Sequence, residues 1–152
     1  MEVMDYTVTD WSHKMIVAAG GADVMADIGL PHARVSSEQV VARNPQVIVV
    51  RAMPPNLLGH DTSGEQKVRD TWQAILDRPG WGAIDAVSNR KVYLLAFEIC
   101  SAPRSPIGIL HMAKWFYPEL FPDLDPEQVH HEFLGKFFGL EDYSGMFTYP
   151  QD

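Results

Sequence analysis

Two short, almost wholly apolar runs dominate the hydrophobic pattern of this chain. Val47 to Val50 follows the turn residues Asn44-Pro45, and Val92 to Leu95 follows the turn residues Ser88-Asn89. Apolar runs of this length, bounded by turn residues, are typical of strands that are buried on both faces of a sheet. The pattern therefore predicts two buried strands, and the run from Val3 to Tyr6 is a further strand candidate.

An amphipathic helix is predicted between the two strands. Ser63-Gly64-Glu65-Gln66 has the form of a capping box, which begins a helix. Apolar residues then recur at helical spacing, at Val68, Trp72, Ile75 and Leu76. A strand, a helix and a second strand in this order predict a right-handed parallel crossover. The expected fold class is α/β: a three-layer sandwich with a short, mostly parallel central sheet covered by helices on both faces.

Two more helices are predicted in the first third of the chain. The first runs from about Trp11 to Ala19 and ends at Gly20-Gly21, where a glycine can adopt the left-handed conformation that closes a helix. The second begins at the capping box Ser36-Ser37-Glu38-Gln39 and stops before Asn44-Pro45, because the residue before a proline disfavours the helical conformation.

The last third of the chain contains two predicted helices that begin with a proline. Ser105-Pro106 and Asp125-Pro126 each place a capping residue before a proline at the first helical position. The first helix is expected to continue through Ile109, Leu110, Ala113 and Phe116, and the second is expected to carry Val129, Phe133, Phe137 and Leu140 on one stripe. The aromatic tail from Tyr143 to Pro150 is expected to pack back onto the body.

Length and charge exclude several classes of function. The 152 residues are enough for one folded domain, and the 46% hydrophobic and 21% charged residues are ordinary for a globular chain. The formal net charge of −8 repels phosphate backbones, so nucleic acid is not an expected partner. No stretch approaches the 18 or more apolar residues that a membrane span needs, and Met1-Glu2-Val3 lacks the basic and apolar start of a signal peptide.

A ligand site is expected where the two predicted strands end. In open α/β sheets, ligands bind beyond the carboxyl ends of the strands. Here those ends lead into the loops from Arg51 to Thr62 and from Ala96 to Pro103, which combine large apolar groups with one or two charges. That composition is typical of a small-molecule site, although simple surface connections would have the same pattern.

The residues that could carry chemistry form no recognisable catalytic motif. The chain has no GxSxG, GxxxxGK[ST], GxGxxG or HExxH sequence, so an enzyme is not expected. His130 and His131 are adjacent on a predicted helix and point about 100° apart, which disfavours a shared metal ion. His111 is placed on the polar side of its helix. Cys100, the single cysteine, is either a small buried side chain or a nucleophile beside a base.

Two charged residues have both a local and a functional interpretation. Arg104 follows Pro103 at the start of a helix, where it can clamp an anionic ligand or form a surface ion pair. Glu38 lies in the first turn of its helix, where a carboxylate interacts favourably with the helix dipole.

The block from Val35 to Val50 resembles the C-terminal lobe of the ABC-transporter substrate-binding proteins for ferric siderophores, haem and cobalamin. Further blocks match in the same order: Ala18 to Val24, Trp81 to Tyr93, Ala102 to Ser105, and Tyr117 to Pro150. The resemblance covers almost the whole chain. It implies an extracytoplasmic protein, periplasmic or at the cell surface and tethered there, with two α/β lobes, a linking helix and a ligand cleft between the lobes.

On this resemblance, residues 1–152 are a single α/β lobe, the C-terminal one, of a longer protein whose signal peptide and N-terminal lobe are not in this chain. The implied function is solute binding for an ABC importer, with no intrinsic cofactor and no insertion of this lobe into the membrane. The implied ligand is an iron-siderophore, haem or corrinoid complex, and the implied partners are the transmembrane subunits of the permease. The alternatives are a small metal- or thiol-dependent enzyme and an acidic protein-interaction domain.

The resemblance also implies roles for particular residues. Glu38 matches a glutamate that docks onto an arginine of the permease. The expected ligand-binding residues are His32, Met53, Phe97, Glu98, Ile99 and Arg104. His32 matches a ligand-contacting aromatic of the cobalamin-binding members and departs from it in type, which argues against cobalamin.

Overall fold

The structure, a computed structural model, describes residues 6–29, 32–52, 57–60, 62, 64–141 and 143–151. At its centre is a three-stranded sheet in the order β3-β4-β5. Its strands are β3 (Ile48–Ala52), β4 (Val92–Ala96) and β5 (Thr148–Tyr149). β3 and β4 are parallel, with Ile48 opposite Val92, as expected from the strand-helix-strand order. β5 is antiparallel to β4, so the sheet is mixed.

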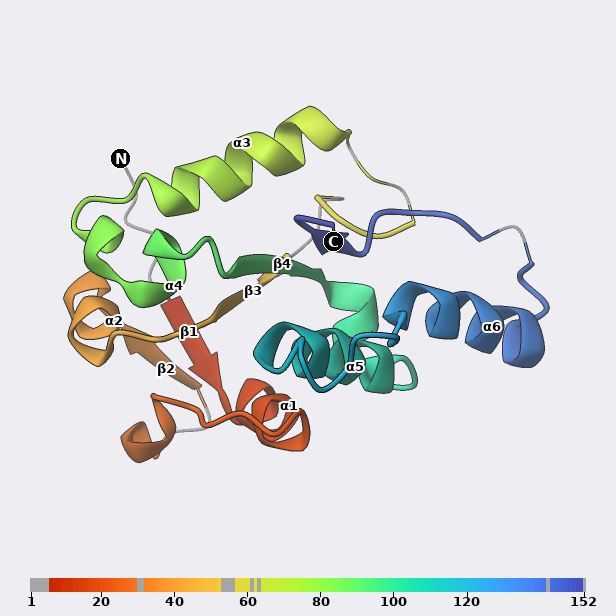
Figure 1. The fold of residues 1–152 in the computed structure, drawn as a ribbon, viewed down its shortest axis with the longest axis horizontal. Helices are drawn as coiled ribbons and strands as arrows, with labels where there is room; N and C mark the ends of the chain where they lie inside the picture. The colour runs from red at the N-terminus through yellow and green to blue at the C-terminus, as the bar shows by residue number, and fades with distance from the viewer. Residues whose placement is uncertain are drawn as a thin grey trace.

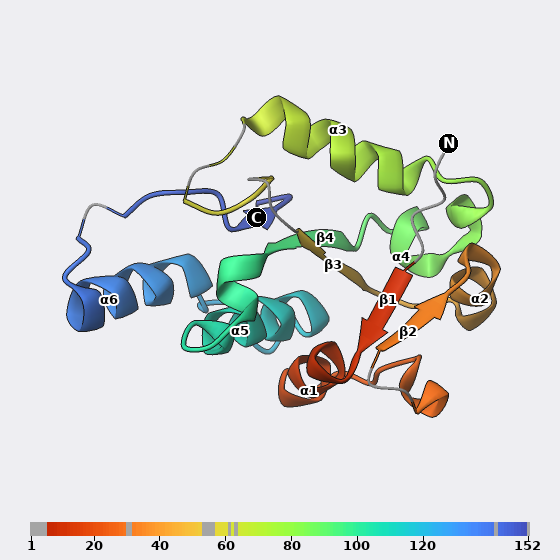
Figure 2. The same ribbon diagram turned by 180° about the vertical axis from the view of Figure 1, so that it is seen from behind.

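Helices cover both faces of this sheet, which gives three layers (Figure 1). α3 (Glu65–Leu76) lies on one face, and α1 (Asp10–Ala18) and α5 (Ser105–Phe116) lie on the other, as the view from behind also shows (Figure 2). The described residues also form α2 (Ser37–Arg43), α4 (Asp85–Ser88) and α6 (Pro126–Phe138), and the short 3-10 helices η1 (Ala26–Ile28), η2 (Trp81–Ala83) and η3 (Phe97–Cys100). The predicted α/β fold class with helices on both faces is confirmed.

A separate pair of strands lies beside the main sheet (Figure 1). β1 (Tyr6–Thr9) is antiparallel to β2 (His32–Val35), with Tyr6 opposite Val35. The strand expected over Val3 to Tyr6 therefore begins at its last residue, and its first three residues lie outside the described ones. The sequence pattern did not predict β2.

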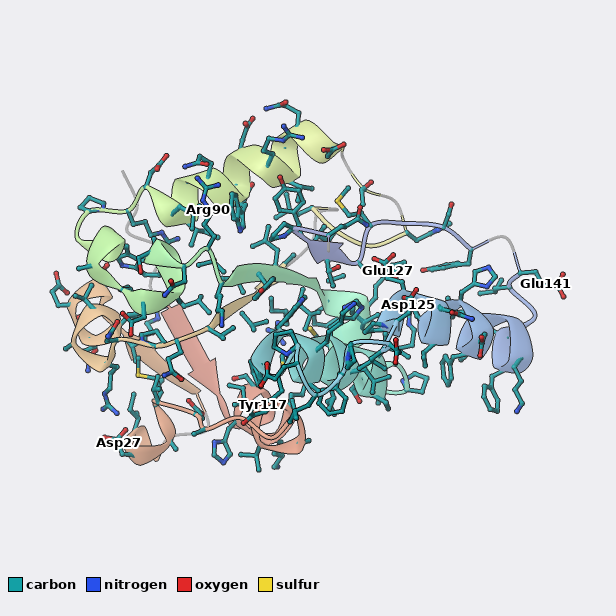
Figure 3. All side chains as sticks on the ribbon, in the orientation of Figure 1. Asp27, Arg90, Tyr117, Asp125, Glu127 and Glu141 are labelled. Atoms are coloured by element: carbon teal, nitrogen blue, oxygen red, sulfur yellow. The ribbon has the colours of Figure 1, made fainter. Side chains whose placement is uncertain are left out.

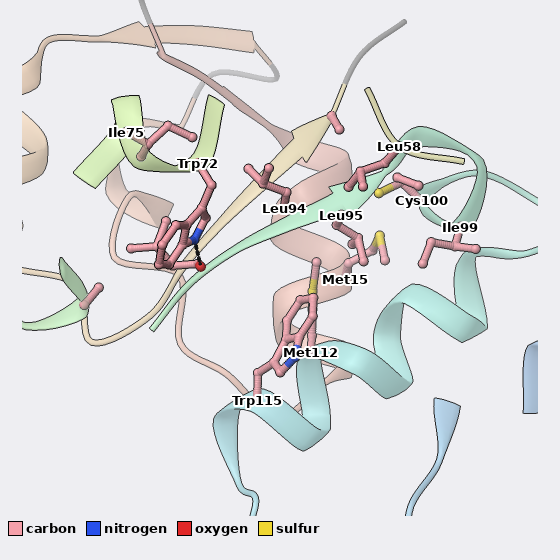
Figure 4. Close-up of a cluster of buried hydrophobic side chains, with 14 of the residues drawn as sticks. Met15, Leu58, Trp72, Ile75, Leu94, Leu95, Ile99, Cys100, Met112 and Trp115 are labelled. Atoms are coloured by element: carbon pink, nitrogen blue, oxygen red, sulfur yellow. Dashed lines mark hydrogen bonds between the residues drawn. The ribbon is translucent and has the colours of Figure 1, made fainter. Parts of the chain in front are cut away.

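The core is built around β4 (Figure 4). The side chains of Leu94 and Leu95, which are consecutive in the strand, point to opposite faces of the sheet. Both are fully buried because helices pack on both faces. From α3, the indole Nε1 of Trp72 donates a hydrogen bond of 2.7 Å to the carbonyl oxygen of Val92. β3 is less buried than expected, with four of its five residues only half-buried, because it lies at the edge of the sheet.

Three predicted helix ends are confirmed in detail. α1 is followed by Gly20 in the left-handed conformation, with φ of 83°. At the start of α2, the Oγ of Ser36 accepts from the backbone N–H of Gln39, and the Gln39 side chain accepts from the N–H of Ser36, which is a complete capping box. At the start of α6, Asp125 accepts hydrogen bonds from the next turn.

Two other predicted caps are wrong. The residue that caps α3 is Gly64, with φ of 105°, and it has no side chain that could accept the hydrogen bonds of a capping box. Ser63, the expected cap, lies outside the described residues. α5 begins one residue earlier than expected, with Arg104 as the cap and Ser105 already helical. The reason is a turn in which the N–H of Arg104 donates to the carbonyl oxygen of Ser101, so the chain enters the helix sooner.

The buried face of α5 differs from the predicted one. The core side carries Ile107, Gly108, His111, Met112 and Trp115, whereas the apolar residues named from the sequence, Ile109, Leu110, Ala113 and Phe116, are half-buried. His111, placed on the polar side by the sequence pattern, is only 5% exposed. Gly108 is needed at this face because a Cβ there would collide with the carbonyl oxygen of Ile99.

The predicted apolar stripe of α6 faces away from the core. Val129, Phe137 and Leu140 are exposed, with Phe137 at 65%, and Phe133 is half-buried. The buried face consists of Pro126, His130 and Leu134. The returning tail decides this orientation, because its Phe147 packs edge-on against His130 with ring centroids 4.6 Å apart. The prediction that the tail packs onto the body is confirmed.

Candidate functional site

Three segments that are distant in sequence meet at the carboxyl end of the sheet. η3 directly follows β4, residues 57–60 belong to the loop after β3, and residues 143–146 belong to the tail. Gly59 and Met146 exchange two backbone hydrogen bonds, of 2.7 Å and 3.2 Å. The edge expected from strand polarity is therefore formed by two strand-end loops and also by the tail, which the sequence did not place there.

A carboxylate, a guanidinium and a phenol form the polar centre of this edge. Nη1 of Arg104 lies 3.1 Å from Oε2 of Glu98, and both side chains are partly shielded, at 21% and 30% exposure. The hydroxyl of Tyr143 donates to the same Glu98 oxygen at 2.8 Å, and Arg104 donates to that hydroxyl at 3.4 Å. Burial raises the pKa of Tyr143, and its hydrogen bond to Glu98 acts in the same direction, so the phenol remains a donor at neutral pH.

His60 connects this centre to the loop after β3. Its backbone N–H donates to Oε1 of Glu98 at 3.2 Å. Its ring Nδ1 donates to the carbonyl oxygen of Ser144 at 2.8 Å, since a carbonyl can only accept. The His60 and Tyr143 rings are stacked, with centroids 4.2 Å apart and planes 16° apart.

Phe97 is an exposed aromatic residue at the same edge, and the half-buried Arg51 lies beside it. Phe97, the first residue of η3, is 39% exposed although it is a large aromatic side chain. The guanidinium of Arg51, near the end of β3, lies 5.3 Å from the centre of the Phe97 ring, which is a cation–π distance. An exposed aromatic face beside a cation can contact a ligand that combines apolar and anionic groups.

The other predicted site residues are placed as follows. Ile99 is fully buried in the core. Met53 lies outside the described residues, and so does the side chain of His32, whose backbone forms the first residue of β2. Glu38 is exposed in the first turn of α2, and a hydrogen bond with Ser36 lowers the pKa of its carboxyl. α2 lies beside the amino ends of β3 and β4, away from η3 (Figure 1).

Sequence reasoning placed Arg51 in the strand-end loop but not among the ligand-binding residues, and it did not place Tyr143 at this edge. Arg51 was at the boundary of the predicted loop, so its position alone could have marked it. Tyr143 was included only as an aromatic of the tail. No local signal pairs it with Glu98, which lies 45 positions away.

Two titratable side chains are buried near the edge. Burial raises the pKa of the Cys100 thiol to about 12, so the thiol is protonated and is a poor nucleophile at neutral pH. Burial, with a contribution from Arg104, lowers the pKa of His130 to about 4. His130 is 3% exposed, and its Nε2 makes no hydrogen bond with the described part of the chain.

A separate pocket of about 340 Å³ lies between α5, the start of α6 and the tail. Its lining includes Trp115, Asp123, Asp125, Glu127 and Gln151, of which Asp125 and Glu127 are labelled in Figure 3. This pocket is lined by none of the edge residues described above, which are Arg51, His60, Phe97, Glu98, Arg104 and Tyr143. Within the described ranges, no three His, Cys, Asp or Glu side chains are grouped so that they could hold a metal ion. No helix in those ranges is long and apolar enough to cross a membrane.

A small sheet with helices on both faces and an exposed edge at its strand ends is the class of lobe from which solute-binding proteins are built. The chain belongs to the family described as periplasmic binding protein, whose sequence profile matches residues 8–98. This family consists of binding proteins and not of enzymes.

Curated relatives in this family bind different solutes. The chain is 28% identical over 130 residues to the molybdate-binding protein MolA of Haemophilus influenzae. This match covers 82% of this chain and 33% of that protein. It is 34% identical over 96 residues to the vitamin B12-binding protein of Salmonella typhimurium, covering 59% of this chain and 32% of that protein. The chain therefore spans about a third of the length of these relatives.

Solved structures show the same lobe. The TroA-like periplasmic binding protein FepB from Veillonella parvula superposes with a TM-score of 0.78 at 27% identity, over 91% of this chain and 41% of that one. MolA of Haemophilus influenzae bound to molybdate superposes with a TM-score of 0.67 at 25% identity, over 90% of this chain and 40% of that one.

Proposed function

We propose that this chain is one lobe of the solute-binding component of an ABC importer and that its strand-end edge forms one wall of the ligand cleft. The observation that carries the proposal is the exposed ring of Phe97 with the half-buried Arg51 beside it, at the carboxyl ends of the two parallel strands. In this role the edge only has to bind the ligand and does not have to catalyse a reaction. A second lobe would supply the opposite wall, and the protein would meet its ligand outside the cytoplasm.

The proposed ligand is a metal chelate: an iron-siderophore, haem or corrinoid complex. The Phe97 ring offers a flat apolar face for the body of such a ligand, and the Arg51 guanidinium places a positive charge beside that ring, which favours oxyanion or carboxylate groups. Molybdate is an anion without an apolar body, so it would use the cation but not the ring. The two side chains together favour the larger chelates.

The proposed partner is the transmembrane part of the permease, with Glu38 as a docking residue. Glu38 is exposed, and its lowered pKa keeps the carboxylate charged across the physiological range. A fixed charge on a helix of defined orientation can set the register of docking and guide association. Because α2 and η3 lie at different ends of β3 and β4, docking and ligand binding would use different parts of the surface (Figure 1).

The test is a binding titration of the full-length protein with a defined panel: ferrioxamine, ferric enterobactin, haemin, cyanocobalamin and sodium molybdate. We expect one chelate to bind with a submicromolar Kd. Arg51→Gln and Phe97→Ala should each weaken that binding about tenfold or more. The control is Arg69→Gln, which removes an exposed guanidinium on α3 that pairs with Glu65. Absence of binding across the panel, or unchanged affinity in both edge variants, would contradict the proposal.

A further inference from the structure

The tail and the two strand-end loops are connected in a closed circuit of hydrogen bonds. Tyr143 bonds to Glu98, Glu98 to the backbone of His60, and the His60 ring to the backbone of Ser144, next to Tyr143. The circuit therefore starts and ends in the tail. It joins segments that are 38 and 84 positions apart in the chain.

Glu98 has both carboxylate oxygens committed inside this circuit. Oε1 accepts from the His60 N–H, and Oε2 accepts from the Tyr143 hydroxyl while it pairs with Arg104. A ligand group that approached Glu98 would have to replace one of these charge-assisted bonds. Arg104 is likewise directed at Glu98 and Tyr143. Glu98 and Arg104 are both half-buried, whereas the Phe97 ring is exposed to solvent.

The backbone of the circuit is built for close approach. Gly59 has a φ of 124°, which only glycine adopts readily, and a Cβ there would collide with Oε1 of Glu98. A Cβ at Gly145 would collide with the carbonyl oxygen of Gly59. Gly59 therefore lets Glu98 of η3 approach the loop after β3, and Gly145 lets the tail contact the same loop, where Tyr143 stacks on His60.

We propose that Tyr143 is a positioning residue that holds the ligand wall in shape through Glu98 and residues 57–60. In this role Glu98 and Arg104 position the wall and do not contact the ligand, whereas Phe97 and Arg51 are the contact residues of the proposed function. The inference rests on the proposed function for the identity of the wall as a ligand surface. The connection that it assigns to Tyr143 stands on the hydrogen bonds themselves.

The primary test uses no ligand. Amide hydrogen exchange of His60 is followed by NMR in the wild-type chain and in Tyr143→Phe, which keeps the ring on His60 and removes only the hydroxyl. We expect His60 exchange to become about tenfold faster in Tyr143→Phe. In a Glu98→Gln background the same substitution should add little, because it acts through Glu98.

The matched control is Tyr117→Phe. The Tyr117 hydroxyl donates to the carbonyl oxygen of Gly20 at 2.7 Å, and the residue, labelled in Figure 3, lies at the end of α5. This variant removes a comparable hydrogen bond and should leave His60 exchange unchanged. Unchanged exchange in Tyr143→Phe, an equal increase in Tyr117→Phe, or full additivity with Glu98→Gln would each overturn the positioning role.

The second arm measures the Kd of the full-length protein for whichever of the five panel compounds binds tightest. We expect Tyr143→Phe to weaken that binding about three- to tenfold and Tyr117→Phe to leave it unchanged. Faster His60 exchange with unchanged affinity would refute the link between this circuit and the ligand. If no compound binds, the proposed function fails, and the exchange result still decides whether Tyr143 holds the wall.

Discussion

The indole Nε1 of Trp81 donates a 2.6 Å hydrogen bond to the hydroxyl of Ser37, 44 positions earlier in the chain. Trp81 is 1% exposed and belongs to η2, whereas Ser37 is the first residue of α2 and immediately precedes Glu38. This bond anchors the amino end of α2 to the core. It therefore fixes the backbone that presents the proposed docking carboxylate.

Ser37→Ala should destabilise the chain by about 1–2 kcal/mol, because it removes an acceptor from a buried indole N–H. The measurement is urea denaturation followed by tryptophan fluorescence. Ser88→Ala, at an exposed serine of α4, is the control and should change stability by less than about 0.5 kcal/mol. Equal stabilities of the two variants would show that the Trp81 bond does not hold α2.

Glu38→Gln should abolish ligand uptake by the complete importer and leave ligand affinity and folding unchanged. The substitution removes the charge proposed for docking but keeps the size of an exposed side chain. Uptake is measured in cells or proteoliposomes that contain the permease, and affinity is measured by titration. Glu119→Gln changes another exposed glutamate and should transport normally. Normal uptake by Glu38→Gln would reject the docking role.

His130 should make the stability of the fold depend on pH between about 6.5 and 4. Its pKa falls from an ordinary value of 6.5 to about 4 in the folded chain, so the unfolded chain binds the proton more tightly in this interval. The contribution to stability is fully present above pH 6.5 and is lost as the pH falls toward 4, by about 1–3 kcal/mol.

The check is urea denaturation at a series of pH values in the wild type and in His130→Leu. The variant should lose the part of the pH slope that the histidine supplies. His131→Gln is the control, because its side chain is exposed on the same helix and should retain the slope. A slope that is the same in the wild type and in His130→Leu would contradict the assignment.

Cys100 should be unreactive toward a thiol reagent while the chain is folded. Its side chain is 1% exposed, and its pKa of about 12 leaves almost no thiolate at pH 8. We expect labelling by a disulfide reagent to be at least about a hundredfold slower in buffer than in 6–8 M urea, a range that unfolds most single domains. Similar rates in both conditions would show that the thiol is accessible in the native state.

The two faces of α6 should respond oppositely to substitution. Leu134→Ala, on a residue that is 3% exposed, should cost about 2–5 kcal/mol because it leaves a cavity in the packing between α6 and the body. Phe137→Ser, on a residue that is 65% exposed, should change stability by less than about 1 kcal/mol. Thermal or urea denaturation measures both. The reverse order would restore the face expected from the sequence.

Much of the fold follows from signals between neighbouring residues. The apolar run Val92 to Leu95 became the buried strand β4, and the capping box at Ser36 began α2 where it was expected. Both signals depend on residues within a few positions of each other, so the sequence contains them completely. The edge at the strand ends was predictable for the same reason, because strand order and polarity place the loops after β3 and β4 together.

The helix faces were less predictable because more than one side of each helix is apolar. Along α6, Val129, Phe133 and Phe137 recur at helical spacing, yet the buried side is the one that carries His130 and Leu134. Spacing identifies a helix, but the choice between two possible faces depends on what packs against it. Here that partner is the returning tail, with Phe147 against His130.

The sequence by itself determined the α/β class, the parallel pair of strands and the end of the sheet at which a ligand site is expected. Only the tertiary structure decided how that end is built. The Glu98 carboxylate is bonded by Arg104, by the backbone of His60 and by Tyr143, and the tyrosine comes from a tail 45 positions away. The physical reason is that hydrogen bonds between distant segments depend on the path of the folded chain and have no periodicity or local motif along the sequence.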